Sequence, residues 1–555
     1  MLEDKLVIKL LKSLFFGSVY MIFSKRNLAL CLISIASISI ILKLYFVDFS
    51  LPLINDGQWY SLQAISNVNG DFEIHPKRNP GWPLLLSPFY SLINSNDFLV
   101  FSNVTRIVSI LLLTSAILPM YLFSRRFFNE KYSLVAACLL AFEPHLNYWS
   151  GFGYAESLYI PLVILTLYFI MSKDNKLVYL SFVFAGLMWW VRLEGIVMIL
   201  IISCIFFLLN SRSKKLLLKY FICIVIFVII ISPILIQRNN QFDDPFYLYY
   251  NERLFIDDFY EEGLKDSEKT ASKYIEDSGI EQFTSRFLVD GAFNVLEQTI
   301  HLSAPYLLIL VPLGLLFSLR VFDQNGSYVK ANWIMLLLYG AIMIIPLAVI
   351  TERRFLLALL PPLIIFAVIP IQRLVEYGLS TFSFSSKNKN ISLVIILCVI
   401  LLLSALFMDR YERKDISVEN EKMLFADFLI NDLDGLIFDP ATSRTFDHGY
   451  LNFSKLNNPP GNFRNFQVFD DPVLGSGNSV LEMYGDSLNE IITNAKNLNV
   501  KYILVDEENN NDILDELYLE KQNYSFLDKI HDTQENGMKK LKIKVFEINF
   551  EQLTP

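Results

Sequence analysis

The sequence predicts a polytopic membrane protein: a mainly α-helical bundle followed by a soluble C-terminal α/β domain. Hydrophobic residues make up 53% of the 555 residues, and the mean hydropathy is +0.41. Apolar runs of about 17 to 22 residues recur, each long enough to cross a ~30 Å hydrocarbon core as a helix. Backbone polar groups need internal partners in lipid, and these runs lack the alternation of a barrel strand. We therefore expect the spans to be helices.

The apolar runs predict about eleven spans. They are expected at residues 28–47, 100–123, 132–149, 154–171, 177–191, 194–210, 220–236, 300–319, 332–350, 355–371 and 391–408. The run from 6 to 23 carries Lys9 and Lys12 within a Leu/Phe pattern, which favours an amphipathic helix along the interface. Because no small-residue cleavage site follows the first apolar stretch, we expect no cleavable signal.

Lys and Arg are concentrated in alternate short loops, which predicts the orientation of the spans. The richer loops include Arg125 and Arg126 and the run "SRSKKLLLK" at 211–219, and these loops should be cytoplasmic. The N-terminus is then cytoplasmic, and the loops 48–98 and 237–299 face outward. An odd number of spans places the C-terminus outside as well. We expect a multi-pass protein of the cell membrane, with amphipathic surface helices in the second outer loop.

The chain changes character after Met408. Residues 412–555 carry 14 Lys and Arg against 26 Asp and Glu, a net charge of −12, whereas the whole chain has a net charge of −9. The runs "DGLIFD", "NVKYILVD" and "LKIKVFEINF" are β-rich, and "SLNEIITNAKNLN" before the second of them is typical of an amphipathic helix. The sequence therefore predicts an N-terminal cytoplasmic or interfacial segment (1–27), a membrane domain (28–411) and an acidic, extracytoplasmic α/β domain (412–555).

Ionisable side chains gather at the outward ends of the predicted spans. Such residues are costly near membrane depth and are therefore candidates for function. The candidates are Asp56, His75, Lys77, Arg78, Glu143, His145, Glu156, Arg192, Glu194, Arg238, Glu352, Arg353 and Arg354. Acids and bases from separate parts of the chain meeting at one face are typical of a site for an anionic, membrane-embedded substrate.

Several motifs follow one another in a particular order between residues 50 and 371. They are "DGQWYSLQA" from Asp56 through Tyr60, "RNPGWPLLL" from Arg78, "FGYAESLYIP" around Glu156, "GLMWWVRLEG" with Arg192 and Glu194, "RNNQFDDPF" from Arg238, and "ERRFLLALLPPL" around Arg353. This order resembles the membrane glycosyltransferases of the GT-C superfamily. The likeness is greatest to the group of dolichyl-phosphate-mannose protein mannosyltransferases and aminoarabinose transferases, which carry an outward D-x-x-x-Y-x-x-x-A pattern and a G-L-x-x-x-x-R-x-E-G segment.

The resemblance implies a chemistry and partners. The donor would be a sugar on a polyprenyl (dolichyl) phosphate in the bilayer, and the acceptor a hydroxyl of a protein, glycan or lipid. Transfer of a hexose-type sugar with inversion needs a base and cations for the departing phosphate. The resemblance leaves open whether a divalent metal ion takes part. It implies no certain cofactor and no nucleic-acid partner.

The resemblance also implies roles for single residues. Asp56 is expected to be the general base, and Glu156, where the family usually has Asp, would orient the acceptor or bind a metal. Tyr60, His75 and Glu194 would contact sugar or acceptor. Two of five cations are expected to bind the phosphate: Lys77, Arg78, Arg192, Arg238 and Arg353.

Each of these residues also has a purely structural interpretation. Asp56 could cap the helix that follows it, and Glu156 could lie at the N-terminal dipole of the fourth span. Arg192 and Glu194 could pair with each other at a helix break. Arg353 and Arg354 could anchor a span at the interface, and the two histidines could form local hydrogen bonds, since they lack metal-binding spacing. The five cysteines lie singly inside apolar runs, which favours simple packing.

Three other functions compete with sugar transfer from a lipid phosphate. An oligosaccharyltransferase belongs to the same superfamily, but the tail has no W-W-D-Y-G sequence. A transporter or flippase of lipid-linked sugars would carry intramembrane charges too, but such proteins often show inverted repeats, and we find none between the halves of this chain. A non-catalytic scaffold with a sensor tail would leave Asp56 without a role.

Overall fold

The computed structural model places the chain in two compact units. It describes residues 25–211, 215–247, 254–255, 270–319, 326–409, 415–439, 448–458, 461–468, 480–483, 485, 487–507 and 512–552. The first unit comprises Met1–Val47, Glu73–Leu85 and Arg106–Glu412, and the second comprises Asp48–Phe72, Leu86–Thr105 and Arg413–Pro555. The predicted interfacial helix at 6–23 lies outside the described residues.

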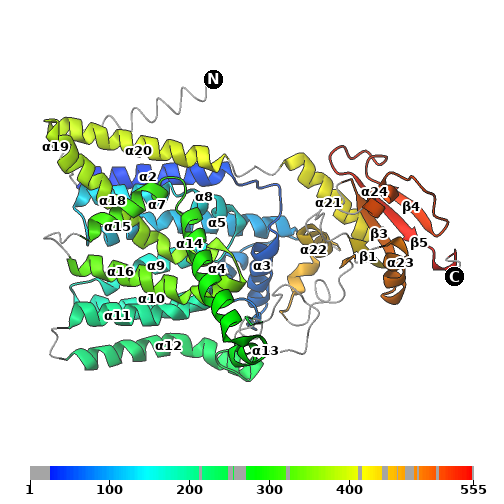
Figure 1. The fold of residues 1–555 in the computed structure, drawn as a ribbon, viewed down its shortest axis with the longest axis horizontal. Coiled ribbons are helices and arrows are strands. Elements are labelled where there is room, and N and C mark those ends of the chain that lie inside the picture. The colour runs from blue at the N-terminus through cyan, green and yellow to red at the C-terminus, as the bar shows by residue number, and fades with distance from the viewer. Residues whose placement is uncertain are drawn as a thin grey trace. The chain divides into compact units, whose positions relative to one another are not determined.

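The first unit is an α-helical bundle, as the sequence predicts (Figure 1). Its α-helices are α2 (Lys25–Tyr45), α6 (Ile117–Ser124), α7 (Glu130–Ala141), α8 (Pro144–Trp149), α9 (Glu156–Ile170), α10 (Asn175–Val191), α11 (Met198–Asn210), α12 (Leu216–Phe242), α13 (Ala271–Phe283), α14 (Gly291–Leu302), α15 (Leu307–Ser318), α16 (Gly326–Ile342), α17 (Ile344–Val349), α18 (Leu360–Arg373), α19 (Leu379–Thr381) and α20 (Ser386–Met408). Short 3-10 helices are η1 (Ser150–Phe152), η2 (Leu193–Val197) and η4 (Arg353–Leu359), and π-helical turns are η3 (Thr284–Asp290) and η5 (Leu374–Gly378). Helices α4 (Gly81–Tyr90) and α5 (Phe98–Ser115) run from one unit into the other.

The bundle has a buried centre and an apolar outside, as expected for a protein surrounded by lipid. Among the described residues, 6 helices are long and apolar enough to cross a membrane, and 7 if one bent pair is counted as a span; the helices Glu156–Ile170 and Lys176–Val191 are shorter and apolar. The span containing α18 is 89% buried, whereas those of α2 and α12 are 17% and 22% buried. Helix α18 is therefore central, and α2 and α12 present apolar faces outward.

Several predicted spans are broken helices, among them 132–149 and 332–350. The run 132–149 divides into α7 and α8 because Glu143 begins a new helix: its carboxylate accepts a hydrogen bond from the Leu146 amide at 2.6 Å, and Pro144 occupies the first turn. The run 332–350 divides into α16 and α17 at Met343. The count of eleven membrane crossings therefore stays a prediction.

The second predicted outer loop contains a helix that crosses the direction of the spans. Helices α13 and α14, joined through η3, make an angle of 114° with α15. Figure 1 shows α13 and α14 lying across the ends of the long helices. One face of α14 is buried through Gly291, Gln298 and Leu302, and its opposite face is apolar and exposed. This is the amphipathic surface helix that the sequence predicts between 237 and 299.

The second unit contains the predicted α/β domain. Its helices are α3 (Asn55–Val68), α21 (Ile416–Asn431), α22 (His448–Asn457), α23 (Leu488–Asn497), α24 (Asp512–Tyr518), η6 (Asn462–Asn465) and η7 (Phe550–Gln552). Its strands are β1 (Leu436–Asp439), β2 (Val480–Glu482), β3 (Val500–Asp506), β4 (Leu527–Asp532) and β5 (Ile543–Ile548), in the order β2-β1-β3-β5-β4. The pairs β1–β2 and β1–β3 are parallel, and β3–β5 and β4–β5 are antiparallel. The three predicted β-runs and the predicted helix are all present, as β1, β3, β5 and α23.

The loop after α2 is built into the same unit as the tail. Gln58 of α3 donates a hydrogen bond to the Gly449 carbonyl at 3.3 Å. The rings of Phe98 and Phe101 pack edge-on against Phe463, with centroids 5.4 and 5.3 Å away. Because loop and tail share one core, they lie on the same side of the membrane, and the chain crosses it an even number of times between them.

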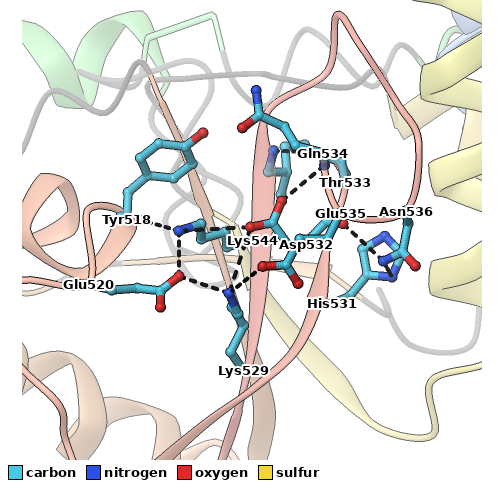
Figure 2. Close-up of polar contacts among 11 residues, drawn as sticks. Tyr518, Glu520, Lys529, His531, Asp532, Thr533, Gln534, Glu535, Asn536 and Lys544 are labelled. Carbon is cyan, nitrogen blue, oxygen red and sulfur yellow. Dashed lines mark hydrogen bonds and ion pairs between the residues drawn. The ribbon is translucent and has the colours of Figure 1, made fainter.

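A charged cluster ties the last two strands to the segment that follows α24 (Figure 2). Lys529 reaches Glu520 at 2.9 Å and Glu535 at 3.0 Å, and Lys544 reaches Glu520 at 2.5 Å and Asp532 at 3.8 Å. Hydrogen bonds from Lys544 and Lys529 lower the pKa of the Glu520 carboxyl below its ordinary value of 4.5. The cluster fixes the β4–β5 hairpin against its neighbours.

Candidate active site

The chain bends sharply where α10 ends, and this bend places Arg192. Helix α10 ends at Val191, and Arg192 is extended, with φ −143° and ψ 147°. The chain then turns into η2 and α11. A Cβ at Gly195 would come within 2.4 Å of the Met188 backbone, so only glycine fits there. The R-x-E-G spacing read from the sequence is therefore the sequence of a tight reversal between two spans.

Five charged side chains from three parts of the first unit form one network. Arg192 donates to Glu156 from Nη1 and to Glu194 from Nε, the latter at 2.6 Å. Arg354 lies with Nη1 3.7 Å from the same Glu156 oxygen and with Nη2 2.7 Å from Glu352. Glu156 therefore bridges two guanidinium groups. Three carboxylates and two guanidiniums leave the network with a formal charge of −1.

The network is largely shielded from solvent. The side chain of Glu156 is 4% exposed and that of Arg192 11% exposed. The Arg192 guanidinium lies 5.3 Å from the centre of the Phe355 ring, and that of Arg354 lies 4.8 Å from the Tyr154 ring. Both structural interpretations offered by the sequence hold here: Arg192 pairs with Glu194 at a helix break, and Glu156 occupies the first turn of α9. The network nevertheless contains more than these local contacts, because Glu156 also lies close to Arg354.

The segment 73–85 docks against the ends of α10 and α12 through the R-N-P-G-W-P motif. Asn79 donates to the carbonyl of Trp189, and Arg238 Nη2 donates to Asn79 Oδ1 at 2.6 Å. Trp82 donates to the Gly153 carbonyl at 2.8 Å, just before α9. A Cβ at Gly81 would lie 2.6 Å from the Trp190 carbonyl oxygen. This segment is therefore fastened to the end of α10, which Arg192 follows, and to the turn before α9, whose first residue is Glu156.

Arg238 is fully buried, with 0% exposure. Besides Asn79 it donates to the Tyr247 carbonyl through Nη1. Both terminal nitrogens of its guanidinium thus bond protein atoms. Sequence reasoning grouped it with the other arginines because a buried guanidinium and a substrate-binding guanidinium look alike in a motif.

The remaining predicted cations lie on the first unit but outside the network. Arg353 opens η4 beside Arg354, is half-buried, and forms no ion pair with any residue that the structure describes. Lys77 and Arg78 are half-buried on the segment 73–85. His75 bonds locally, since its Nδ1 accepts a hydrogen bond from the Lys77 amide at 3.1 Å.

Asp56 and Tyr60 belong to the second unit, in the first and second turns of α3. Asp56 is half-buried and Tyr60 is buried. The N-cap of α3 is Ile54, whose side chain accepts no capping hydrogen bond. Asp56 is therefore not the N-cap residue, and its carboxylate lies in the first turn of α3, where the helix dipole favours it.

A buried polar cluster in the first unit contains Lys43, which was not among the predicted candidates, beside Glu143 and His145, which were. Lys43, 2% exposed, donates to Asn147 at 2.8 Å and to Ser39 at 2.5 Å. Glu143 bonds His145 Nδ1 at 2.8 Å, in agreement with the local role expected for that histidine. The signal was a lysine inside the predicted span 28–47. Among the residues in the described ranges, no three His, Cys, Asp or Glu side chains are placed to hold a metal ion.

The sequence and the fold of this chain are similar to those of known proteins. Residues 75–236 match the family model described as dolichyl-phosphate-mannose-protein mannosyltransferase. No curated protein sequence matches. The archaeal oligosaccharyltransferase AglB from Archaeoglobus fulgidus, solved with an inhibitory peptide and a dolichol-phosphate, is similar with a TM-score of 0.53 and 14% identity, covering 87% of this chain and 70% of that chain.

A second solved structure matches along nearly its whole length. ArnT from Cupriavidus metallidurans, bound to undecaprenyl phosphate, is similar with a TM-score of 0.53 and 10% identity, covering 94% of this chain and 98% of that chain. Identities this low show the fold. The chain therefore shares the fold of these membrane proteins, and residues 75–236 resemble the dolichyl-phosphate-mannose-protein mannosyltransferase family.

Proposed function

We propose that this protein transfers a hexose-type sugar from a polyprenyl phosphate to a hydroxyl of an extracytoplasmic acceptor. The network of Glu156, Arg192 and Arg354 at the ends of three apolar helices carries the proposal. Charges are expensive there and are retained mainly for function. Two proteins of similar fold were solved with dolichol-phosphate and undecaprenyl phosphate, which supports a lipid-phosphate donor.

The proposed reaction is a single displacement. The acceptor oxygen attacks the anomeric carbon of the sugar on the face opposite the phosphate and gives its proton to the Asp56 carboxylate. The bond from the anomeric carbon to the phosphate oxygen breaks, and the electron pair leaves with the polyprenyl phosphate. One inversion results, and no covalent enzyme intermediate is needed.

The contacts of each cation decide its order among our candidates for binding the donor phosphate. Arg353 is our first candidate for the phosphate, because no described carboxylate neutralises it. Arg192 is the second, since a guanidinium offers five N–H donors and can serve carboxylates and a phosphate together. Lys77 and Arg78 remain candidates on the docked segment. Arg238 receives a positioning role instead, because it is fully buried and holds Asn79.

Glu156 and Glu194 receive roles from the network in place of those that the resemblance implies, and Tyr60 and His75 keep theirs. Glu156 orients the two arginines and thereby the phosphate. Glu194 fixes Arg192 from the other side. Tyr60 and His75 are proposed to contact sugar or acceptor. Assays with and without EDTA decide whether a divalent metal ion takes part.

The test is transfer from a labelled polyprenyl-phosphate hexose by the full chain in liposomes supplied with membrane extracts as acceptor. Asp56→Asn should lower the rate by about 10²- to 10⁴-fold, the usual contribution of a general base. Asp48→Asn, a change of a half-buried acid just after α2, should leave the rate unchanged. Unchanged transfer by Asp56→Asn would remove Asp56 as the base.

A second variant tests the phosphate site separately. Arg353→Gln should raise the KM for the donor, whereas Arg373→Gln, at the other end of α18, should not. The likeness to AglB also makes an oligosaccharyltransferase a second candidate. If the label moves only from a lipid-linked oligosaccharide to asparagine, the single-sugar proposal fails and that alternative stands.

A further inference from the structure

A cavity of about 140 Å³ lies in the second unit, between the end of α3, the segment after α4 and η6. Its inner wall is formed by Ile65, Tyr90 and Phe101, which are all buried, whereas the polar residues Asn69 and Ser91 line its exposed rim. The Tyr90 hydroxyl is already engaged, since it donates to the Phe101 carbonyl at 3.1 Å. This wall therefore offers an apolar surface and no hydroxyl to a ligand.

One cation lies at this cavity. Arg464 donates from Nε to the Ser95 carbonyl at 2.9 Å, and from Nη2 to the same oxygen. Its guanidinium lies 5.9 Å from the centre of the Phe101 ring. These contacts hold the side chain in place and leave Nη1 without a hydrogen bond to the described residues.

Arg464 has no ion pair with any described residue, although its domain is strongly acidic. Residues 412–555 carry 26 Asp and Glu, and Lys529 of β4 and Lys544 of β5 both form ion pairs with carboxylates. A guanidinium that stays unpaired among so many acids, and that borders a cavity, is suited to an acid brought by a ligand.

The size of the cavity limits what it can hold. Pockets for whole small molecules usually measure about 300–1,000 Å³, so this one has room for a single side chain. An apolar side chain fits the wall better than a sugar, whose hydroxyls would lose their hydrogen bonds there. The ligand is therefore a part of a larger molecule.

We propose that this cavity is an acceptor subsite that binds a peptide through one apolar side chain and a neighbouring carboxylate, the latter held by Arg464. The inference rests on the proposed function and names its acceptor class. Ile65 follows Asp56 by nine residues along α3, about 14 Å at 1.5 Å per residue. An extended peptide covers this distance in about four residues. The reacting hydroxyl should accordingly precede or follow the acid by about four positions.

Binding can be measured without any donor, so it stands apart from the transfer assay. The probe is 4-fluorobenzoate, followed by fluorine NMR line broadening on the full chain in detergent, with the neutral 4-fluorobenzamide as reference. The wild type should bind benzoate more tightly than benzamide. Arg464→Gln should weaken benzoate binding by about tenfold or more, the loss expected for a hydrogen bond to a charged group.

Two further variants keep the result interpretable. Val68→Phe fills the rim of the cavity without touching Arg464 and should abolish binding even if Arg464→Gln does not fold. Lys496→Gln removes an exposed cation elsewhere in the domain and should change nothing. Equal binding of the two probes, or undiminished binding by Val68→Phe, overturns the site.

Competition identifies the acceptor class. Displacement of the probe by N-acetyl-Phe-Glu-amide supports a peptide acceptor, and displacement by methyl glucuronide alone overturns it in favour of an acidic glycan. If the probe binds as expected while no sugar is transferred, the subsite stands and the proposed function fails. If sugar is transferred but the probe does not bind, only the subsite is rejected.

Discussion

Gln58 Nε2 donates a hydrogen bond to the Gly449 carbonyl oxygen at 3.3 Å, across 391 positions of sequence. The first residue belongs to the loop after the first span and the second to the tail, and Ile54 of the same loop packs against the core of the tail domain. A loop and a tail that share a core must lie in the same compartment. The location of the tail therefore follows from that of Asp56, whichever way the bundle is oriented.

Labelling in sealed vesicles tests this topology. In a background without the exposed cysteines Cys204 and Cys398, Asn94→Cys in the loop and Lys521→Cys in the tail should react together with a membrane-impermeant maleimide. Lys387→Cys, at the opposite end of α20, should react only after permeabilisation or only in inverted vesicles. Opposite behaviour of Asn94→Cys and Lys521→Cys would contradict the shared unit.

The bridging carboxylate of the network should be costly to remove. Glu156→Gln leaves two shielded guanidiniums without their common partner, and breaking a buried ion pair in this way costs about 3–5 kcal/mol. We expect a marked drop in the thermal midpoint of the full chain in detergent. Glu130→Gln is the matched control, because its side chain is 46% exposed and pairs with Arg125 at 3.9 Å; such exposed pairs contribute about 0–1 kcal/mol. Equal effects of the two changes would rule out a special role for Glu156 in stability.

Lys43 should stabilise the fold through charge. Lys43→Met removes the ammonium group near the Glu143 carboxylate and leaves Asn147 without its donor. A loss of about 3–5 kcal/mol is expected by the same reasoning, whereas Lys176→Met on an exposed helix end should be neutral. In Lys43→Met/Glu143→Gln the lone carboxylate is gone, so part of the thermal stability should return. Additive losses would show that the two side chains do not interact.

The hairpin β4–β5 should lose stability in mild acid. Burial lowers the pKa of His531 below its ordinary value of 6.5, and the nearby carboxylates of Asp532 and Asp432 oppose the shift. Because the unfolded chain binds the proton more readily, this contribution is present above about pH 6.5 and is lost as the pH falls toward the folded pKa. Hydrogen exchange of the strand amides between pH 7.5 and 5 measures it.

His531→Phe should flatten this pH dependence, because the new ring can keep the stack on Phe428, whose centroid lies 3.9 Å away. His301→Phe changes an exposed histidine of α14 and should not. An unaltered profile in His531→Phe would assign the acid sensitivity to other groups.

The exposed apolar face of α14 should contact lipid. Phe293, Leu296 and Ile300 are 44–65% exposed, and their spacing of three and four residues places them on one helical face. A nitroxide on Phe293→Cys should collide more with oxygen than with a water-soluble nickel chelate. Leu424→Cys on the tail, 60% exposed, should show the opposite ratio. Equal ratios would place α14 in water.

The sequence was sufficient where a pattern repeats locally. Strands β3 and β5, helix α23 and the long apolar helices follow from periodicity within single segments. The reversal at Arg192 was visible in the R-x-E-G spacing, because Gly195 fits only a close approach of backbones. These features depend on neighbours a few positions away.

The rest depends on contacts between distant residues. Nothing in the local pattern separates Arg353, which has no ion pair with described residues, from Arg354, which joins Glu156. The burial of Arg238 follows from Asn79, 159 positions earlier. Nor could the lone cation Arg464 be recognised, because its cavity is formed by three separate segments.

The core shared by Gln58 and Gly449 also determines when the protein can finish folding. Residues 48–105 emerge from the ribosome more than 300 residues before the tail begins at Arg413. Until then Ile54, Phe98 and Phe101 lack the side chains of the tail that pack against them. Maturation of the domain therefore follows insertion of the last span, and a nascent chain stalled before that point is the form most exposed to aggregation and quality control.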